Sequence, residues 1–288
     1  MIPVPKSNQY YTLITGASEG IGKALAEYCA KLGLNLVLIA LPGEKLENTG
    51  QYLKFKYKIE VYSLGIDLTS EGACLRVINW FDKNNISVNI LINNAGFGDT
   101  GNFDEIPCDN YLKQIQLNIV TLTVLTRRLI NRLKNNGPAY ILNVGSIAGF
   151  FMVPYKTVYG ATKSFVNSFS LSLREELAPL GINVSVLCPG GVSSNHQAIQ
   201  RKTKHGWIGR MSFLTPEQVA KAAIIGLFQN KRVIIPGFIN RMLFRLNHIL
   251  TPKMRAMIAI KGLRKELETE KQELKHQRLG VILAGMNK

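Results

Sequence analysis

Short apolar runs alternate with longer stretches of helical periodicity along most of the chain, and this alternation restricts the fold more than any other feature of the sequence. Neighbouring parallel strands need crossover connections, and continuous apolar runs suit strands that are covered on both faces. The pattern therefore predicts the α/β class, with a doubly wound parallel sheet of about seven strands and helices on both faces. The expected strands are residues 10–15, 35–40, 59–64, 88–93, 139–144, 183–187 and 232–235, and the expected helices are residues 20–32, 43–56, 70–83, 111–134, 159–180 and 216–229.

A glycine-rich turn, TGASEGIG at residues 15–22, connects the first expected strand to the first expected helix. Its three glycines let the backbone turn tightly and approach a pyrophosphate, while the helix N-terminus presents free N–H groups to the anion. A glycine triplet alone would fit an ordinary turn equally well. The strand before it and the helix after it favour a dinucleotide-binding site.

Several motifs, taken in order, resemble the short-chain dehydrogenase/reductase family. TGASEGIG is similar to its cofactor loop, and NNAG at residues 93–96, YGATK at residues 159–163 and Pro189-Gly190 follow in the family's order. The chain also resembles a broad bacterial subgroup of these reductases, whose substrates are mostly undefined. The resemblance implies a Rossmann-type fold and an NAD(P)-dependent oxidoreductase. It implies cofactor contacts from Gly16, Ser18, Glu19, Gly20, Ile21, Gly22, Leu41, Asp67, Leu68, Asn94, Ala95, Gly96, Tyr159, Lys163, Pro189, Gly190, Val192 and Ser194.

The residues at the end of the second expected strand distinguish NAD from NADP in such folds. An acidic side chain there favours the free 2′-hydroxyl, and a basic one favours a 2′-phosphate. Ala40 and Leu41 stand at this point, so neither signature is present. By resemblance, relatives that prefer NADP often carry Arg in place of Leu41 and a basic residue in place of Glu19. The missing acidic residue and the net charge of +16 favour NADP over NAD.

Tyr159 and Lys163 are four residues apart on an expected helix, so their side chains share a face. A neighbouring ammonium and an oxidised nicotinamide would both lower the pKa of the phenol, which could then exchange a proton with a carbonyl or an alcohol. The resemblance implies that Ser146 binds the substrate oxygen and that Asn118 fixes a water that relays protons to Lys163. Without the resemblance, Tyr159 and Lys163 would indicate a solvated pair on a helix surface. Ser146 would indicate a turn cap, and Asn118 a buried amide.

The connection after the sixth expected strand, about residues 192–214, is predicted to be a substrate lid, because long connections in compact α/β proteins are usually functional. Ser194 stands where relatives have a Thr that contacts the nicotinamide carboxamide. Large apolar side chains here and in neighbouring loops predict an apolar pocket for a hydrophobic ketone, such as a 3-oxoacyl, sphingoid or steroid-like ketone. The expected pocket residues are Phe97, Phe150, Tyr155 and Trp207.

The oxidoreductase domain is expected to cover residues 1–237, followed by a basic, partly amphipathic helical extension over residues 238–288. Seven basic residues and no acidic one lie in residues 238–265. Apolar residues recur there at three- and four-residue spacing as far as Pro252, which predicts an amphipathic helix. Such a helix suits an anionic membrane surface, a flap over the pocket or a contact with a second subunit. Packing is favoured over membrane contact.

The four cysteines are far apart, with no CxxC pair and no histidine at finger spacing, so neither a metal site nor a disulfide framework is expected. The sequence shows no signal peptide and no apolar run that could span a bilayer. These features predict a cytoplasmic protein, with peripheral contact at the inner membrane face as the alternative.

Two other classes of function stay open. A dinucleotide-binding regulator or scaffold would keep the fold without turnover, although such proteins usually lose the Tyr or the Lys of the YxxxK pair. A nucleic-acid binder would use the basic tail, but the chain has no recognised module, so no nucleic-acid partner is expected. By resemblance, a homodimer or homotetramer would form through the helices of residues 109–134 and 158–179, with Phe165, Phe169 or Leu173 facing the partner.

Overall fold

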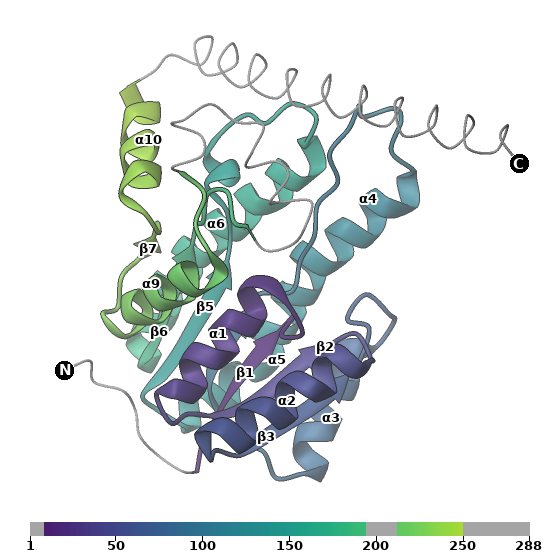
Figure 1. The fold of residues 1–288 in the computed structure, drawn as a ribbon, viewed down its shortest axis with the longest axis vertical. Coiled ribbons are helices and arrows are strands. Elements are labelled where there is room, and N and C mark those ends of the chain that lie inside the picture. Colours follow the sequence, from purple (N-terminus) through teal and green to yellow (C-terminus); the bar gives the residue numbers. More distant parts are fainter. Residues whose placement is uncertain (1–8, 194–211, 250–288) are drawn as a thin grey trace, which may run out of the picture.

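The computed structural model describes residues 9–193 and 212–249 of the chain (Figure 1). These residues form a seven-stranded sheet with the strand order β3-β2-β1-β4-β5-β6-β7, in which every neighbouring pair is parallel. The predicted α/β class and doubly wound parallel sheet are therefore confirmed. The strands are β1 Tyr11–Thr15, β2 Asn35–Ala40, β3 Val61–Gly65, β4 Val88–Asn93, β5 Ala139–Val144, β6 Ile182–Leu187 and β7 Val233–Ile234.

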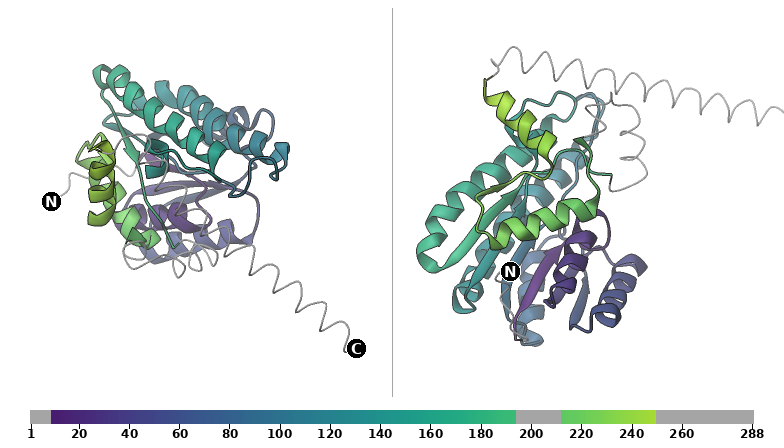
Figure 2. Two further views of the ribbon diagram at one scale, coloured as in Figure 1. Left: turned by 90° about the horizontal axis from the view of Figure 1, so that it is seen from above. Right: turned by 60° about the vertical axis from the view of Figure 1, so that its left-hand side comes forward.

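Helices cover both faces of the sheet, as the view from above shows (Figure 2). One face carries α1, α2 and α9, and the other carries α3, α5 and α6. The α-helices of the described residues are α1 Gly20–Lys31, α2 Glu44–Tyr57, α3 Ala73–Lys83, α4 Cys108–Ile115, α5 Leu122–Asn135, α6 Thr157–Leu177, α9 Pro216–Phe228 and α10 Phe238–Ile249. Shorter turns are η1 Gln116–Thr121, η2 Ile147–Phe150 and η3 Ala178–Leu180.

Two hydrophobic cores follow from this layering, because successive side chains of a strand point to opposite faces. In β1, Ile14 lies in the core beneath α1 and α9, whereas Leu13 lies in the core beneath α3 and α5. Leu38 and Val37 of β2 divide between the same two cores. Continuous burial of this kind explains why the strands read as uninterrupted apolar runs.

The prediction of one continuous helix over residues 111–134 is wrong. The helix begins earlier, at Cys108, and is divided into α4, the π-helical turn η1 and α5. A π-helical turn adds a residue to the helical repeat, and such turns are frequent at functional sites. Asn118 is buried within η1, so the irregular turn coincides with a residue that the sequence marks for catalysis.

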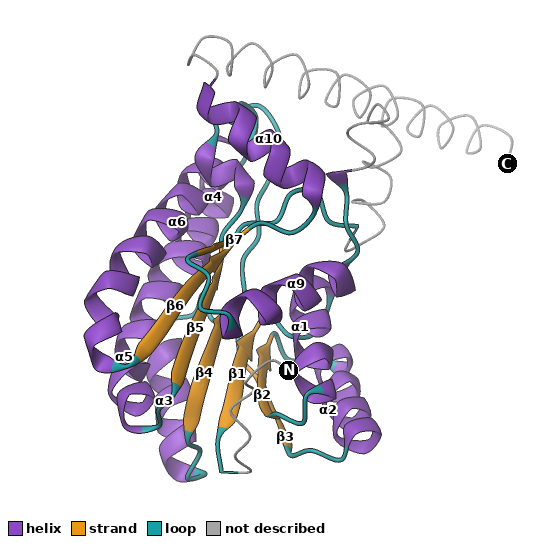
Figure 3. Cartoon of the chain, turned by 90° about the vertical axis from the view of Figure 1, so that its left-hand side faces the viewer, coloured by secondary structure: helices purple, strands orange, loops and turns teal. Residues whose placement is uncertain are grey.

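The carboxyl ends of the strands meet on one side of the molecule, and α10 follows β7 directly into this region (Figure 3). The strand order reverses between β1 and β4, which places a crevice at their carboxyl ends. Among residues 9–193 and 212–249, no helix is long and apolar enough to cross a bilayer.

Candidate active site

The loop after β1 is shaped to hold a dinucleotide. Gly16 and Gly20 have positive φ values of 66° and 56°, a conformation that costs glycine nothing. A Cβ on Gly22 would lie only 1.9 Å from the Gly16 carbonyl oxygen, so the helix and loop touch backbone to backbone. The first turn of α1 has no side-chain cap, which leaves its N–H groups available to an anion. These features fit the pyrophosphate of a nicotinamide dinucleotide.

The NNAG segment after β4 fixes this loop. Asn94 donates from Nδ2 to the carbonyl oxygens of Thr15 at 2.9 Å and Gly16 at 3.1 Å. The backbone N–H groups of Asn94 and Ala95 both donate to the Thr15 hydroxyl at 3.0 Å. The two expected cofactor motifs are thus joined across the switch point between β1 and β4.

The adenosine side of the expected site lies at the ends of β2 and β3. Leu41 is 65% exposed directly after β2. Glu19, just before α1, forms an exposed ion pair with Lys45 at 2.9 Å. Asp67 accepts hydrogen bonds from the backbone N–H and the hydroxyl of Thr69, which lower the pKa of its carboxyl. Leu68 is buried beside it.

The loop after β6 forms the remaining cofactor wall. The Pro189 carbonyl oxygen accepts from the Ile147 N–H at 3.1 Å, which ties this loop to the segment after β5. Val192 forms a parallel bridge with Leu214. Gly190 has no room for a side chain, because a Cβ there would lie 2.6 Å from Oδ1 of Asn240 on α10. Ser194, the expected carboxamide contact, lies outside the described residues.

The four expected catalytic residues come together between β4, β5 and α6. Ser146 follows β5 directly, and Tyr159 and Lys163 lie one turn apart on α6. The Lys163 ammonium lies 5.8 Å from the centre of the Tyr159 ring and donates to the Val144 carbonyl oxygen at 2.7 Å. Tyr159 shares a hydrogen bond with Ser146. This arrangement places an acid–base phenol beside a hydroxyl that can bind the same substrate oxygen.

Asn118 reaches the site from the π-helical turn. Its Nδ2 donates to the Phe97 carbonyl oxygen at 2.9 Å and to the Thr162 hydroxyl at 3.0 Å. A Cβ on Gly96 would lie 2.8 Å from Asn118 Oδ1 and 3.4 Å from the Lys163 ammonium. Asn118 and Lys163 therefore border the same small space.

Burial dominates the protonation of the acid–base pair. Desolvation raises the pKa of Tyr159, although its hydrogen bond with Ser146 acts in the opposite direction. Desolvation also lowers the pKa of Lys163 to about 8. The pKa of Tyr159 is raised overall, because the cost of burying a phenolate is larger than the stabilisation from Ser146. The lowering expected from the ammonium and an oxidised nicotinamide stays a prediction.

The expected substrate residues lie in different positions. Phe97 is partly exposed in the loop after β4, and Phe150 ends the η2 turn that carries Ser146. Tyr155 has a positive φ of 63°, and its carbonyl oxygen accepts from the Gly101 N–H at 2.9 Å. Trp207 and most of the expected lid lie outside the described residues.

Phe244 of α10 contacts an expected pocket residue and was not identified from the sequence. Its ring packs edge-on against Phe150, with the centroids 4.9 Å apart. An aromatic side chain at this position could have indicated a contact. The other apolar residues of α10 already form the amphipathic pattern, however, so the sequence did not single Phe244 out. Only the packing of α10 on the η2 turn shows which side of the helix faces the site.

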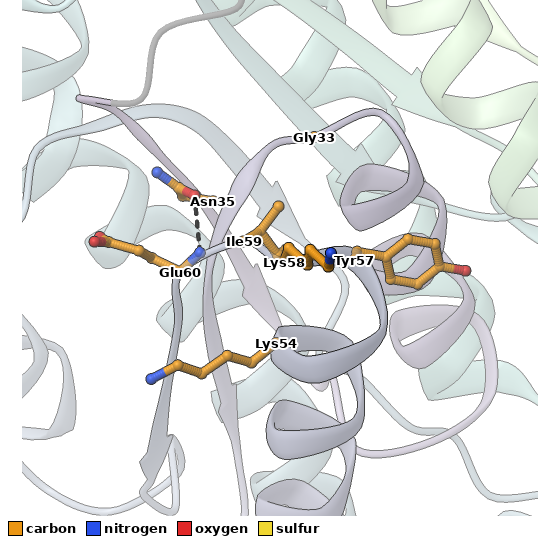
Figure 4. Close-up of a pocket in the computed structure, with 7 residues that line it drawn as sticks. All are labelled: Gly33, Asn35, Lys54, Tyr57, Lys58, Ile59 and Glu60. Carbon is orange, nitrogen blue, oxygen red and sulfur yellow. Dashed lines mark hydrogen bonds between the residues drawn. The ribbon is translucent and has the colours of Figure 1, made fainter.

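A surface pocket of about 500 Å³ lies elsewhere (Figure 4). Its lining comes from the segments that precede β2 and β3, at the amino ends of the strands, where the Glu60 N–H donates to Asn35 Oδ1 at 3.0 Å. It contains none of the residues expected to bind cofactor or substrate. The lining residues are Gly33, Asn35, Lys54, Tyr57, Lys58, Ile59 and Glu60.

In residues 9–193 and 212–249, no three His, Cys, Asp or Glu side chains gather as a group that could hold a metal ion. The four cysteines, Cys29, Cys74, Cys108 and Cys188, are free thiols.

Comparisons with known proteins agree with this geometry. The family model for short chain dehydrogenase matches residues 11–205. A very-long-chain 3-oxoacyl-CoA reductase from Macaca fascicularis is 32% identical over 218 residues, which cover 74% of this chain and 67% of that protein.

Two solved structures are similar in fold and sequence. A bulky-bulky ketone specific alcohol dehydrogenase from Comamonas testosteroni is 30% identical, with a TM-score of 0.71 over 84% of this chain and 92% of that one. A short-chain dehydrogenase from Sphingobium yanoikuyae, in complex with NADPH, is 29% identical, with a TM-score of 0.70 over 90% of this chain and 95% of that one. With the family model spanning most of the catalytic fold, the chain belongs to the short-chain dehydrogenase family.

Proposed function

We propose that this protein reduces a hydrophobic ketone to a secondary alcohol, with NADPH as the hydride donor and Tyr159 as the proton donor. The reaction class follows from family membership, because the relatives are oxidoreductases of ketones and alcohols that use NADP or NAD. The observation that carries the assignment is the convergence of Ser146, Tyr159 and Lys163 beside the carboxyl end of β5.

Each side chain has a task that its surroundings support. The bound nicotinamide would supply the hydride. Ser146 donates a hydrogen bond to the substrate oxygen, on which negative charge develops during reduction. Tyr159 transfers its proton to the same oxygen. Lys163, held by the Val144 carbonyl oxygen, supplies the positive charge that favours the phenolate left behind, and Asn118 fixes the loop at Phe97 that borders both.

The aromatic residues near the catalytic side chains support a hydrophobic substrate. Phe97 is bonded through its backbone to Asn118, Phe150 ends the turn that begins at Ser146, and the ring of Phe244 packs on Phe150. Related proteins are named for very-long-chain 3-oxoacyl-CoA and for bulky-bulky ketones. We therefore include 3-oxoacyl, sphingoid and steroid-like ketones in the proposed substrate class, with Tyr155 and Trp207 as further pocket residues.

NADPH is the proposed cofactor rather than NADH. The described end of β2 carries no acidic side chain that would repel a 2′-phosphate, and Glu19, the nearest carboxylate on the glycine loop, is paired with Lys45. The related Sphingobium enzyme is in complex with NADPH.

A panel of ketones tests substrate and cofactor together. We expect NADPH to be consumed faster than NADH, and kcat/KM for 3-oxoacyl thioesters to rise roughly fourfold for each added methylene until the pocket is full, since burying one methylene contributes about 0.8 kcal/mol. Cofactor absorbance measures both rates. Faster use of NADH would overturn the cofactor assignment. Tight cofactor binding without turnover of any ketone would favour the regulator or scaffold alternative.

The proposed assembly is a homodimer or homotetramer. Exposed apolar side chains, Leu112 on α4, Val120 on η1 and Phe165 on α6, lie on the helices that relatives are expected to pair through. Phe165 also stacks on Phe169. The prediction that Leu173 faces a partner is wrong, because its side chain is buried in the core between α6 and the sheet.

The proposed location is the cytoplasm, which the four free thiols support, with peripheral contact at the inner membrane face through residues 238–265. The described part of this segment, α10, has two different sides. Asn240 and Phe244 face the protein. Phe238, Met242 and Leu246, spaced four apart, are 72%, 48% and 48% exposed beside the exposed Arg241 and Arg245. An apolar stripe next to arginines suits an anionic lipid surface.

Vesicle binding tests this contact. We expect the protein to co-sediment with vesicles containing phosphatidylglycerol, and the double variant Phe238→Ser, Met242→Ser to bind them about tenfold more weakly, because two apolar side chains no longer enter the interface. The control is Phe55→Ser, which removes an aromatic ring from α2 that is 89% exposed, more than Phe238. Equal binding by the double variant and the control would exclude α10 as the contact.

A further inference from the structure

The segment that carries Ser146 needs an anchor, because it leaves β5 and turns at once into the short η2 helix. The Ser146 hydroxyl accepts from the Ala148 N–H at 3.0 Å, which orders the turn internally. That bond does not fix the turn relative to α6, where Tyr159 and Lys163 lie. The position of the hydroxyl over the phenol depends on a contact between the turn and the helix.

Two side chains of α6 make this contact: Ser164 donates from Oγ to the Gly149 carbonyl oxygen at 2.8 Å, at the far end of the turn, and Asn167 bonds Ser146 itself. Asn167 lies on α6 one turn after Lys163 and is 2% exposed. Its Nδ2 donates to the Ser146 carbonyl oxygen at 3.0 Å. Its Oδ1 accepts from the Cys188 thiol at 3.4 Å, at the end of β6. One amide therefore joins the carboxyl ends of β5 and β6 to the helix that carries the acid–base pair.

Two glycines allow the Ser146 segment to close around this amide. A Cβ on Gly145 would lie 2.1 Å from Asn167 Oδ1. A Cβ on Gly149 would lie 2.5 Å from Asn167 Nδ2 and 2.6 Å from the Lys163 carbonyl oxygen. Glycines on both sides of Ser146 thus touch the Asn167 amide directly. A bulkier or apolar side chain at position 167 could not keep both hydrogen bonds in this space.

We propose that Asn167 is a positioning residue, which holds Ser146 in register with Tyr159 and Lys163 and so sets the geometry of the acid–base centre. It acts through the backbone of Ser146 and touches neither the substrate nor the cofactor. This inference rests on the proposed function, because it assigns Asn167 a role in the same reaction.

If Asn167 only stabilised the fold, its replacement would lower stability without a specific effect on catalysis. Another residue of α6 serves as the control for this possibility. Ser170 lies three residues further along the same helix and is equally buried. Its hydroxyl accepts from Asn143 Nδ2 at 2.9 Å and donates to the Val166 carbonyl oxygen at 2.6 Å. Ser170 thus joins α6 to β5 as Asn167 does, but without contact to the Ser146 turn.

The experiment compares Asn167→Ala with Ser170→Ala in the full chain. For Asn167→Ala we expect kcat for ketone reduction to fall about 10- to 100-fold, with the Kd for NADPH within about twofold of the parent, because the loss concerns the transition state. The Ser170→Ala variant should keep kcat within about twofold of the parent. This should hold even if its melting temperature falls as much as that of Asn167→Ala.

The pH profile of alcohol oxidation gives a second readout. Ser146 stabilises the Tyr159 phenolate, so its displacement raises the pKa of Tyr159. Oxidation needs the phenolate, so the half-maximal rate of Asn167→Ala should move to higher pH. Lys163 and Cys188, the neighbouring titratable groups, are intact in both variants. If Asn167→Ala does not fold, Asn167→Ser is used, because its shorter hydroxyl cannot bond both partners.

Three outcomes separate the hypotheses. A fall in kcat and a shifted profile for Asn167→Ala alone support the positioning role. Equal effects in Asn167→Ala and Ser170→Ala, or no change in either readout, overturn it. Turnover that survives in Tyr159→Phe overturns the proposed function itself, whatever the behaviour of Asn167.

Discussion

Replacing Tyr159 by phenylalanine should lower kcat for ketone reduction roughly 10²- to 10⁴-fold, the range that general acid catalysis contributes. The variant keeps the ring that packs against Gly98 and loses only the hydroxyl. NADPH affinity should stay within about twofold, because the glycine loop and the NNAG segment are untouched. Single-turnover reduction, measured by the loss of NADPH absorbance, separates this chemical defect from a binding defect.

The control for this variant is Tyr140→Phe. Tyr140 is a buried tyrosine on β5 whose ring packs on Phe228 of α9, away from the acid–base centre. Its loss of a hydroxyl should leave kcat unchanged. A Tyr159→Phe enzyme that retained a tenth or more of the parent rate would show that another group donates the proton.

Replacing Gly22 by alanine should weaken NADPH binding roughly 5- to 150-fold. The added Cβ would lie 1.9 Å from the Gly16 carbonyl oxygen and 2.5 Å from Asn94 Nδ2, so the glycine loop and the NNAG contact must both shift. Forcing one such group into a packed contact costs about 1–3 kcal/mol, which corresponds to that range in Kd. Fluorescence titration with NADPH measures the affinity, and the melting temperature reports any loss of stability.

Gly160→Ala is the matched substitution. Gly160 is buried on α6, but the nearest atoms to an added Cβ are 3.8 Å away, an ordinary contact distance. Alanine is also the better helix former by about 1 kcal/mol, so this variant should bind NADPH normally and melt no lower than the parent. Unchanged affinity in Gly22→Ala would mean that the loop does not cradle the cofactor.

The central strands were predictable from sequence because β1, β2, β4 and β5 are buried along their whole length, which makes each of them a mainly apolar run. The bounds of β4 and β5 agree with the predicted residues 88–93 and 139–144. The π-helical turn was not predictable, since residues 111–134 keep an amphipathic pattern through the irregularity. Its origin is tertiary: the buried Asn118 bonds Phe97 and Thr162, which lie far from it in the sequence.

The residues of the candidate site that lie in short sequence motifs were predictable from the sequence. Gly16, Asn94, Tyr159 and Lys163 each lie in one, and family resemblance gives them roles. Phe244 and Asn167 lie in no motif. Their importance comes from contacts with the Ser146 turn, which are made only when the helices and the sheet come together.

The central place of β1 in the sheet has a consequence for synthesis of the chain. β1 pairs with β2 on one side and with β4 on the other, so Tyr11 lies opposite both Asn35 and Val88. At about 5–20 residues per second, the ribosome needs roughly 3–10 s to progress from the end of β2 to the end of β4. Throughout that interval, one edge of an apolar strand has no partner, and such edges invite aggregation. The nascent chain is therefore most in need of a chaperone before its fourth strand emerges.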